Sequence, residues 1–239
     1  MSLLFALFTT LQVFASDLSV QVETGAVWQH QNDVKITPQN GTLVEFDHFN
    51  QGPFFHYRLD FIYKFNDKHA IRGVYAPFNI RVSDEISSPV NFNDQSFSAG
   101  QDLTINYKFN SYRLGYLYKL YDSSSLVFNI GATLKVRDAK IEFVQNTTKT
   151  KYDNVGLVPL LFVSLDYKVS NSWNIHSDMD FAAAPQGRAI DLTVKARKEL
   201  SKNSQLGFGV RSLEGGADND KVYTFSWFNY LVVDYLIGF

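Results

Sequence analysis

The chain has 239 residues, enough for one sizeable domain, and its 22 Lys and Arg against 24 Asp and Glu exclude the basic field of a nucleic-acid-binding protein. The absence of cysteine excludes disulfides, thiolate metal sites and cysteine nucleophiles. Aromatic residues make up 15% of the chain, yet no segment beyond the N-terminus approaches the roughly 18 uncharged apolar residues of a membrane helix, which favours a membrane wall built from strands.

An apolar run from Leu3 to Leu11 opens the chain and is too short to span a bilayer. Val13-Phe14-Ala15 follows with residues that suit a signal peptidase, so we expect a secretory signal peptide at 1–15, cleaved before Ser16. No Lys or Arg precedes the run, which departs from the usual basic start of such a signal. A buried first helix is the alternative, although the run lacks an amphipathic face. The remaining residues, 16–239, form one domain.

From Leu18 onward, apolar and polar residues alternate. This spacing predicts strands with one apolar and one charged face, because in a helix every second residue would wind around all faces. The alternating segments are 18–29, 55–65, 126–137, 155–167, 173–181 and 190–197. The stretch 103–119 changes phase near Asn110-Ser111, which leaves open one long bulged strand or two shorter pieces.

Strand length and loop asymmetry distinguish a membrane barrel from a soluble one. Most alternating segments run for about ten residues, the length that crosses a bilayer when tilted, whereas globular strands average about five or six. Short turns at 66–68, 121–125, 168–172 and 198–204 alternate with mostly longer polar loops at 31–51, 83–101, 145–154 and 213–221, and with a short one at 184–188. We therefore predict an all-β fold, a single antiparallel up-and-down transmembrane β-barrel of about ten strands, with eight or twelve as alternatives.

The last strand carries apolar residues at every second position, namely Leu231, Val233, Tyr235, Ile237 and the terminal Phe239. This pattern resembles the C-terminal signature of Gram-negative bacterial outer-membrane β-barrel proteins as a general class. The resemblance implies a location in the outer membrane and a membrane-insertion signal in Tyr235, Ile237 and Phe239 that the barrel-assembly machinery reads. It also implies outer-membrane lipids and lipopolysaccharide as partners; we expect no nucleic acid, and the oligomeric state stays open.

In such a barrel the polar strand faces line the interior, so their charged residues are the candidate functional residues. The lumen-lining candidates are Arg58, Asp60, Arg113, Lys135, Arg137, Asp178, Asp180, Asp191, Lys195 and Arg197. One interpretation is an ion-pair network that fills a narrow barrel, since buried charges need partners. The other is a narrow path for ions or solutes lined by the same charges.

His176, Asp178 and Asp180 are the catalytic candidates, because positions i, i+2 and i+4 of a strand share one face. A histidine oriented by a carboxylate can act as a base on water or on a serine. Omptin-type outer-membrane proteases use an Asp-His pair and an Asp pair on a ten-stranded barrel. This sequence departs from that pattern, because no second acidic pair lies opposite and the chain is short for a protruding barrel. Three polar residues in line recur by chance, so a non-enzyme is favoured.

Glu214, Asp218 and Asp220 flank turn-forming glycines and offer the oxygen ligands that calcium takes, which makes them the metal candidates. Their spacing is not that of an EF-hand loop, and a solvated acidic turn is the favoured interpretation. The sequence has no phosphate-binding glycine loop and no zinc-protease motif, and we expect no cofactor.

Three functions of different classes remain as hypotheses. The first is a narrow, porin-like channel or transporter for small solutes. The second is a structural or surface-interaction barrel with a plugged lumen. The third is an outer-membrane hydrolase acting on lipid or peptide.

Overall fold

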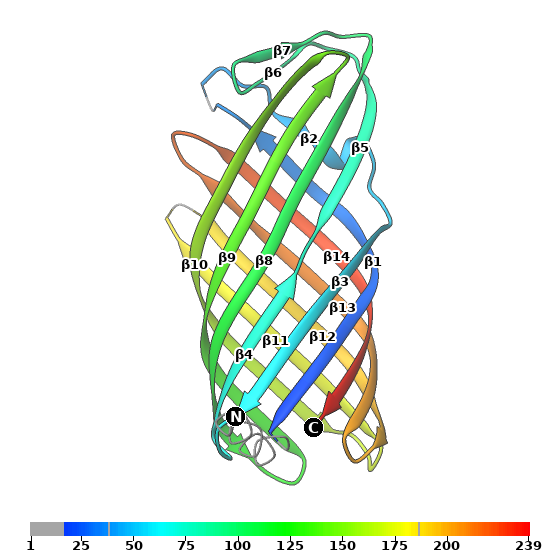
Figure 1. Ribbon diagram of the computed structural model, residues 1–239, viewed down its shortest axis with the longest axis vertical. Helices are drawn as coiled ribbons and strands as arrows, with labels where there is room; N and C mark the ends of the chain where they lie inside the picture. Colours follow the sequence, from blue (N-terminus) through cyan, green and yellow to red (C-terminus); the bar gives the residue numbers. More distant parts are fainter. Residues whose placement is uncertain (1–16, 38, 186) are drawn as a thin grey trace, which may run out of the picture.

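A computed structural model describes residues 17–37, 39–185 and 187–239, which form one closed antiparallel barrel (Figure 1). The expected signal peptide at 1–15 lies outside the described residues. The strands are β1 (Leu18–Lys35), β2 (Val44–Glu45), β3 (Phe54–Lys64), β4 (His69–Ala76), β5 (Asn79–Ile86), β6 (Val90–Phe92), β7 (Gln95–Phe97), β8 (Gln101–Asp122), β9 (Leu126–Gln145), β10 (Thr148–Lys168), β11 (Trp173–Ala184), β12 (Gly187–Ser201), β13 (Ser204–Asp218) and β14 (Tyr223–Gly238). Within the described residues, no helix has the length and hydropathy to cross a bilayer.

In the described chain, ten strands make the barrel wall in up-and-down order, as the sequence predicts. β4 and β5 both pair with β8 and act as one interrupted wall strand. β14 closes the barrel on β1, from Ser19↔Gly238 at one end to Lys35↔Tyr223 at the other. β2 pairs with two residues of β1, and β6 and β7 form a separate hairpin.

The two ends of the barrel differ. Short turns and the end of β14 lie at the lower end in Figure 1, whereas the β6–β7 hairpin and the long β1–β3 connection lie at the upper end. Two predicted loops are wrong, because residues 145–154 and 213–221 lie mostly in paired strands. β9 and β10 continue to a tight turn at Asn146, whose φ of 51° suits asparagine. The polar residues of these strand segments face outward into water. The composition of the segments therefore resembles that of a loop.

The apolar and polar faces of β8 exchange sides near Asn110. Below this point Leu114 is exposed on the outer surface and Arg113 is buried inside. Above it the outer positions are polar, while Leu103 and Ile105 are fully buried inside. β8 is therefore one continuous strand, and the phase change marks the level at which the surroundings of its outer face change from apolar to polar. The register shift of β8 against β9 lies elsewhere, at Lys119/Tyr121.

The same exchange occurs at the matching level of β9 and β10. Asn110 pairs with Asp138, and Asp138 pairs with Val155. Below this level the outer surface forms an apolar band of the kind that faces lipid, which we call the outer apolar band. Its exposed members include Tyr112, Leu114, Ile130, Leu134, Val155, Leu157, Leu161, Leu192, Val194, Phe208, Val210, Leu231 and Val233.

Above the exchange, the barrel interior is packed with apolar side chains, which we call the apolar plug. Its residues are Val27, Val34, Ile36, Val44, Phe46, Phe78, Ile80, Val82, Ile86, Val90, Phe92, Phe97, Leu103, Ile105, Tyr107, Ile141, Phe143, Leu213, Phe228, Tyr230 and Val232. The β6–β7 hairpin contributes Phe92, which stacks on Phe143 of β9 with ring centroids 4.0 Å apart. The segments between wall strands therefore fill the mouth instead of standing free in solvent.

Candidate functional site

Below the apolar plug, charged side chains fill the barrel interior in what we call the charged layer. Its members are Glu23, Arg58, Asp60, Arg72, Arg113, Asp178, Asp180, Asp191, Lys195, Arg197, Arg211 and Asp234, all of them buried. Six are cations and six are anions, so the layer is neutral as a set. This balance is what burial requires, because an isolated charge in low dielectric is strongly disfavoured.

One half of the network joins β3, β4, β8 and β11. Asp60 accepts a hydrogen bond from Arg72 Nε at 3.0 Å, and Arg58 Nε lies 2.7 Å from its other oxygen. Asp180 Oδ2 lies 3.1 Å from one nitrogen of Arg72 and 2.5 Å from one of Arg113. Each carboxylate thus holds two arginines from different strands.

The other half joins β1, β12, β13 and β14. Asp191 accepts hydrogen bonds from Arg211 at 2.6 and 2.8 Å, and it also binds Arg113. Lys195 Nζ bridges Glu23 at 2.5 Å and Asp234 at 3.1 Å. Since Arg113 contacts both halves, the network runs across the lumen from wall to wall.

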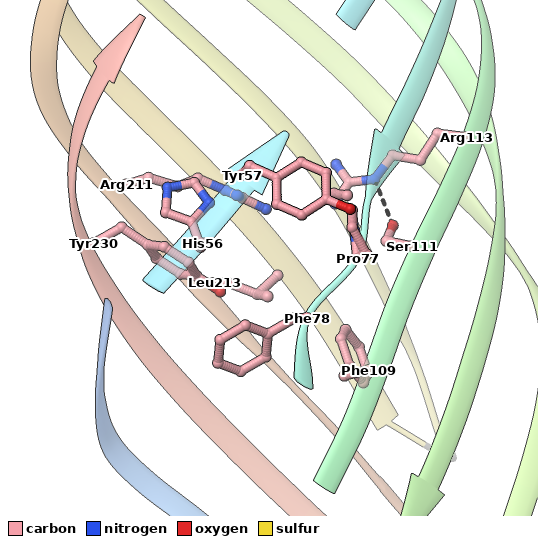
Figure 2. Close-up of a pocket in the computed structure, with 11 residues that line it drawn as sticks. His56, Tyr57, Pro77, Phe78, Phe109, Ser111, Arg113, Arg211, Leu213 and Tyr230 are labelled. Atoms are coloured by element: carbon pink, nitrogen blue, oxygen red, sulfur yellow. Dashed lines mark hydrogen bonds between the residues drawn. The ribbon is translucent and has the colours of Figure 1, made fainter. Parts of the chain in front are cut away.

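The charged layer leaves little space for water. Lys195, Asp180 and Asp234 are each 1% exposed. The void between the layer and the apolar plug has a volume of about 10 Å³, room for about one water molecule. Figure 2 shows Arg113, Arg211 and His56 on one side of this void and Phe78 and Phe109 on the other.

Eight of the ten lumen-lining candidates lie in the charged layer, whereas Arg137 and Lys135, the strand partner of Arg113, line a separate cleft. Of the other four members, the alternation of the last strand places Asp234 inward, whereas Glu23, Arg72 and Arg211 were not selected from the sequence as lumen residues. Glu23 carried a usable signal, because it occupies a polar position of the first alternating segment. Arg211 follows Gly207 and Gly209 on the inner face of β13, and glycines hide the alternation.

Two of the three catalytic candidates, His176 and Asp178, are in contact, whereas Asp180 is bound elsewhere. His176 is held between two carboxylates, with Nδ1 2.7 Å from Asp166 and Nε2 3.2 Å from Asp178. Asp180 instead binds Arg72 and Arg113. With both ring nitrogens engaged, the imidazole has no free position from which to take a proton from a nucleophile.

The metal candidates are also separated. Glu214 and Asp218 lie in β13, and Glu214 binds Arg188 at 2.5 Å. Among the described residues, no group of three His, Asp or Glu side chains is placed to hold a metal ion. The glycines between them pair with β12 and β14 instead of forming a loop.

The C-terminal candidates lie on the outer surface near the lower end. Tyr235 and Phe239 are exposed, and the Phe239 N–H donates a hydrogen bond to the Leu18 carbonyl at 2.9 Å. The end of β14 is thereby tied to the start of β1. Its role as an insertion signal stays a prediction.

A cleft of about 580 Å³ opens in the upper half beside the apolar plug, and we call it the upper cleft. Its wall on β11, β12 and β13 carries small inward residues, including Ala182, Ala189 and Gly215. The corresponding inner positions of β8 and β9 carry Leu103 and Phe143, which fill the space. The interior is hollow on one side because its inner residues there are too small to reach the plug.

The deep end of the upper cleft is cationic. Lys135, only 4% exposed, lies with its Nζ 4.8 Å from the centre of the Phe109 ring. Within the described chain, its contact with the Phe109 ring is accompanied by neither a hydrogen bond nor an ion pair. Arg137 donates one hydrogen bond to Asn154 at 2.5 Å, while its buried Nε has no partner among the described residues.

No family model and no curated protein matches the chain. Among solved structures, the outer membrane protease OmpT from Escherichia coli is similar with a TM-score of 0.56 and 8% identity, over 94% of this chain and 97% of that one. Ail, the attachment invasion locus protein of Yersinia pestis, gives 0.42 and 11%, over 91% and 99%. The P. putida toluene transporter TodX gives 0.42 and 9%, over 94% and 90%.

These identities show the fold alone. The expectation that the chain is too short for a protruding barrel is wrong, because β8, β9 and β10 continue well above the outer apolar band. The general resemblance seen in the last strand is confirmed, and the chain has the fold of the Gram-negative outer-membrane β-barrels.

Proposed function

We propose that this protein resides in the outer membrane as a barrel with a closed lumen, and that it binds a small molecule in the upper cleft. The observation that carries the proposal is a cleft of about 580 Å³ directly above a sealed charged layer. Ligand pockets of proteins measure about 300–1,000 Å³ and combine apolar walls with a few polar groups. The upper cleft has both properties.

A porin-like channel has less support. A water-filled path through the barrel would leave its lining charges in contact with water, yet Lys195, Asp180 and Asp234 are almost fully buried. The interior therefore favours the hypothesis of a plugged lumen. An outer-membrane hydrolase has less support still, because His176 is locked between Asp166 and Asp178.

Planar-bilayer recording of the refolded chain tests the closed lumen. We expect a mobility shift on boiling, typical of a folded barrel, together with no steady ion conductance. An open porin measured in the same bilayers provides the positive control. Steady conductance from the folded chain would overturn the closed lumen.

Binding of an environment-sensitive naphthalene dye tests the cleft. Ala189→Phe places a ring on the inner wall of the upper cleft and should abolish the fluorescence gain. Ala132→Phe makes the same change on the outer surface of β9 and should leave it intact. Equal binding by both variants would remove the upper cleft as the binding site.

A further inference from the structure

Two inner-face cations of β9, Lys135 and Arg137, lie outside the neutral charged layer. The charged layer is neutral without Lys135, and Lys135 is buried two residues from Arg137 on the same inner face of β9. A buried ammonium needs an opposite charge, but Asp191, the carboxylate that attracts it, already binds Arg113 and Arg211, and no described residue forms an ion pair with Lys135. The deep end of the upper cleft thus offers an ammonium and a guanidinium to an anion.

The remaining lining of the upper cleft is largely apolar. Its walls include Ile141, Leu213, Phe228 and Val158, the last being the strand partner of Lys135. An anion that fills the cleft would therefore carry an apolar part several carbons long. Lys140, Arg188, Glu214 and Lys221 also line the cleft. Its cationic deep end and its apolar walls together match an amphiphile.

The cleft also opens through the barrel wall. β10 pairs with β11 only from Lys168↔Asn174 to Leu161↔Phe181, while β10 itself continues upward to Thr148. β11 ends at Ala184, and Figure 1 shows β10 rising above the upper ends of β11 and β12. The upper part of β10 therefore has a free edge on this side in the described pairing. Pro159, which lacks an N–H, stands on that edge, where proline is tolerated.

The opening lies at the level of the outer apolar band. Leu157 lines the upper cleft and is also 68% exposed on the outer surface. It pairs with Val136 of β9, below the level at which the outer surface turns polar. Ala182, Ala183 and Ala184 line the cleft from the other side of the opening. A chain leaving the cleft here would enter lipid and not water.

We infer that the upper cleft binds a single-chain anionic amphiphile, such as a fatty acid or an alkyl phosphate, exchanged sideways with the outer leaflet. The anionic head lies at Lys135 and Arg137, and the alkyl chain passes between β10 and the β11–β12 hairpin. This inference rests on the proposed function and specifies its ligand class and its route of access.

The ligand class is tested by equilibrium binding of labelled dodecanoate and dodecanol to the protein in phosphatidylcholine nanodiscs. Binding to empty nanodiscs is subtracted. Lys135→Met keeps the length of the side chain and removes its charge, and it should weaken dodecanoate binding about tenfold or more. Lys202→Met, in an exposed turn at the lower end, is the matched control and should change nothing. Dodecanol should bind weakly to both variants, and the mobility shift on boiling verifies that both are folded.

The route is tested with Leu157→Cys and Ala184→Cys, combined in a chain that has no other cysteine and bridged by a short bis-maleimide. Bridging should slow the loading of dodecanoate supplied in the bilayer. If bridging leaves loading from the bilayer unchanged, while dodecanoate supplied in water loads fast, sideways access is wrong and the ligand enters from the aqueous phase.

The outcomes separate this inference from the proposed function. If Lys135→Met binds dodecanoate as well as the unaltered chain does, while Ala189→Phe still abolishes dye binding, the ligand class is wrong and the upper cleft remains a binding site. If Ala189→Phe affects neither dye nor dodecanoate, both proposals fail.

Discussion

The lower and upper halves of the barrel interior are packed by opposite means. In the lower half, twelve charged side chains of the charged layer neutralise one another. In the upper half, the apolar plug excludes water as in an ordinary soluble protein. Since β8 and β9 run through both halves, the difference lies in what surrounds the wall. Where the surroundings of the wall are apolar, the apolar residues of an alternating strand face outward. Its polar residues therefore face the interior.

Removing one charge from the charged layer tests the comparison most severely. Asp180→Leu leaves Arg72 and Arg113 without their shared carboxylate, so we expect a loss of about 3–5 kcal/mol in the free energy of unfolding. Urea unfolding in lipid vesicles measures it. Asp138→Leu, which breaks the more exposed pair with Lys108, is the control and should cost far less. Equal losses would mean that the layer is not buried.

Moving a charge onto the outer surface tests the boundary between the halves. Leu161→Arg lies within the outer apolar band and should cost about 2–4 kcal/mol of unfolding free energy near the bilayer midplane. Thr104→Arg lies on the outer face of β8 above the exchange and should cost little. Unfolding of both variants in lipid vesicles measures the two losses of free energy. Equal losses would place the bilayer at a different level of the barrel.

A small deletion in the upper half should act as in a soluble core. Ile105→Val removes one methylene group from the apolar plug, and we expect a loss of about 0.5–1.5 kcal/mol, as for buried isoleucines in general. The loss should not change with salt, because no charge is involved. A salt-dependent loss would contradict the division between the halves.

The smallest expected effect is on the pH dependence of stability, through the carboxyl of Glu142 on the outer surface of the upper half. Burial raises the pKa of Glu142, but hydrogen bonds from Lys149 and Asn106 and the charge of Lys140 outweigh it, and the pKa lies below its usual 4.5. A carboxyl with a depressed folded pKa stabilises the fold above its unfolded pKa and loses that contribution as the pH falls through the folded value. Unfolding midpoints measured from pH 6 down to pH 3 should therefore fall less in Glu142→Gln than in the unaltered chain.

The sequence predicted the strands and the barrel because alternation with period two is a local signal, and the apolar alternation from Leu231 to Phe239 indicated the class. It could not assign the upper parts of β9, β10 and β13, since a polar outer face above the membrane has the composition of a loop. Nor could it place Phe92 and Phe97 inside the mouth, because burial of a loop depends on what lies opposite. The upper cleft depends on the relative heights of β10 and β11, and neither strand contains that information alone.

The exchange of faces near Asn110 and Asp138 also fixes the depth at which the barrel sits. A vertical displacement by two residues, about 7 Å along a strand, would carry either charged side chains into hydrocarbon or exposed leucines into water. Both directions are opposed, so the barrel is held at one height. The side opening beside Leu157 therefore stays level with the same stratum of the outer leaflet, whatever the loops above it are doing.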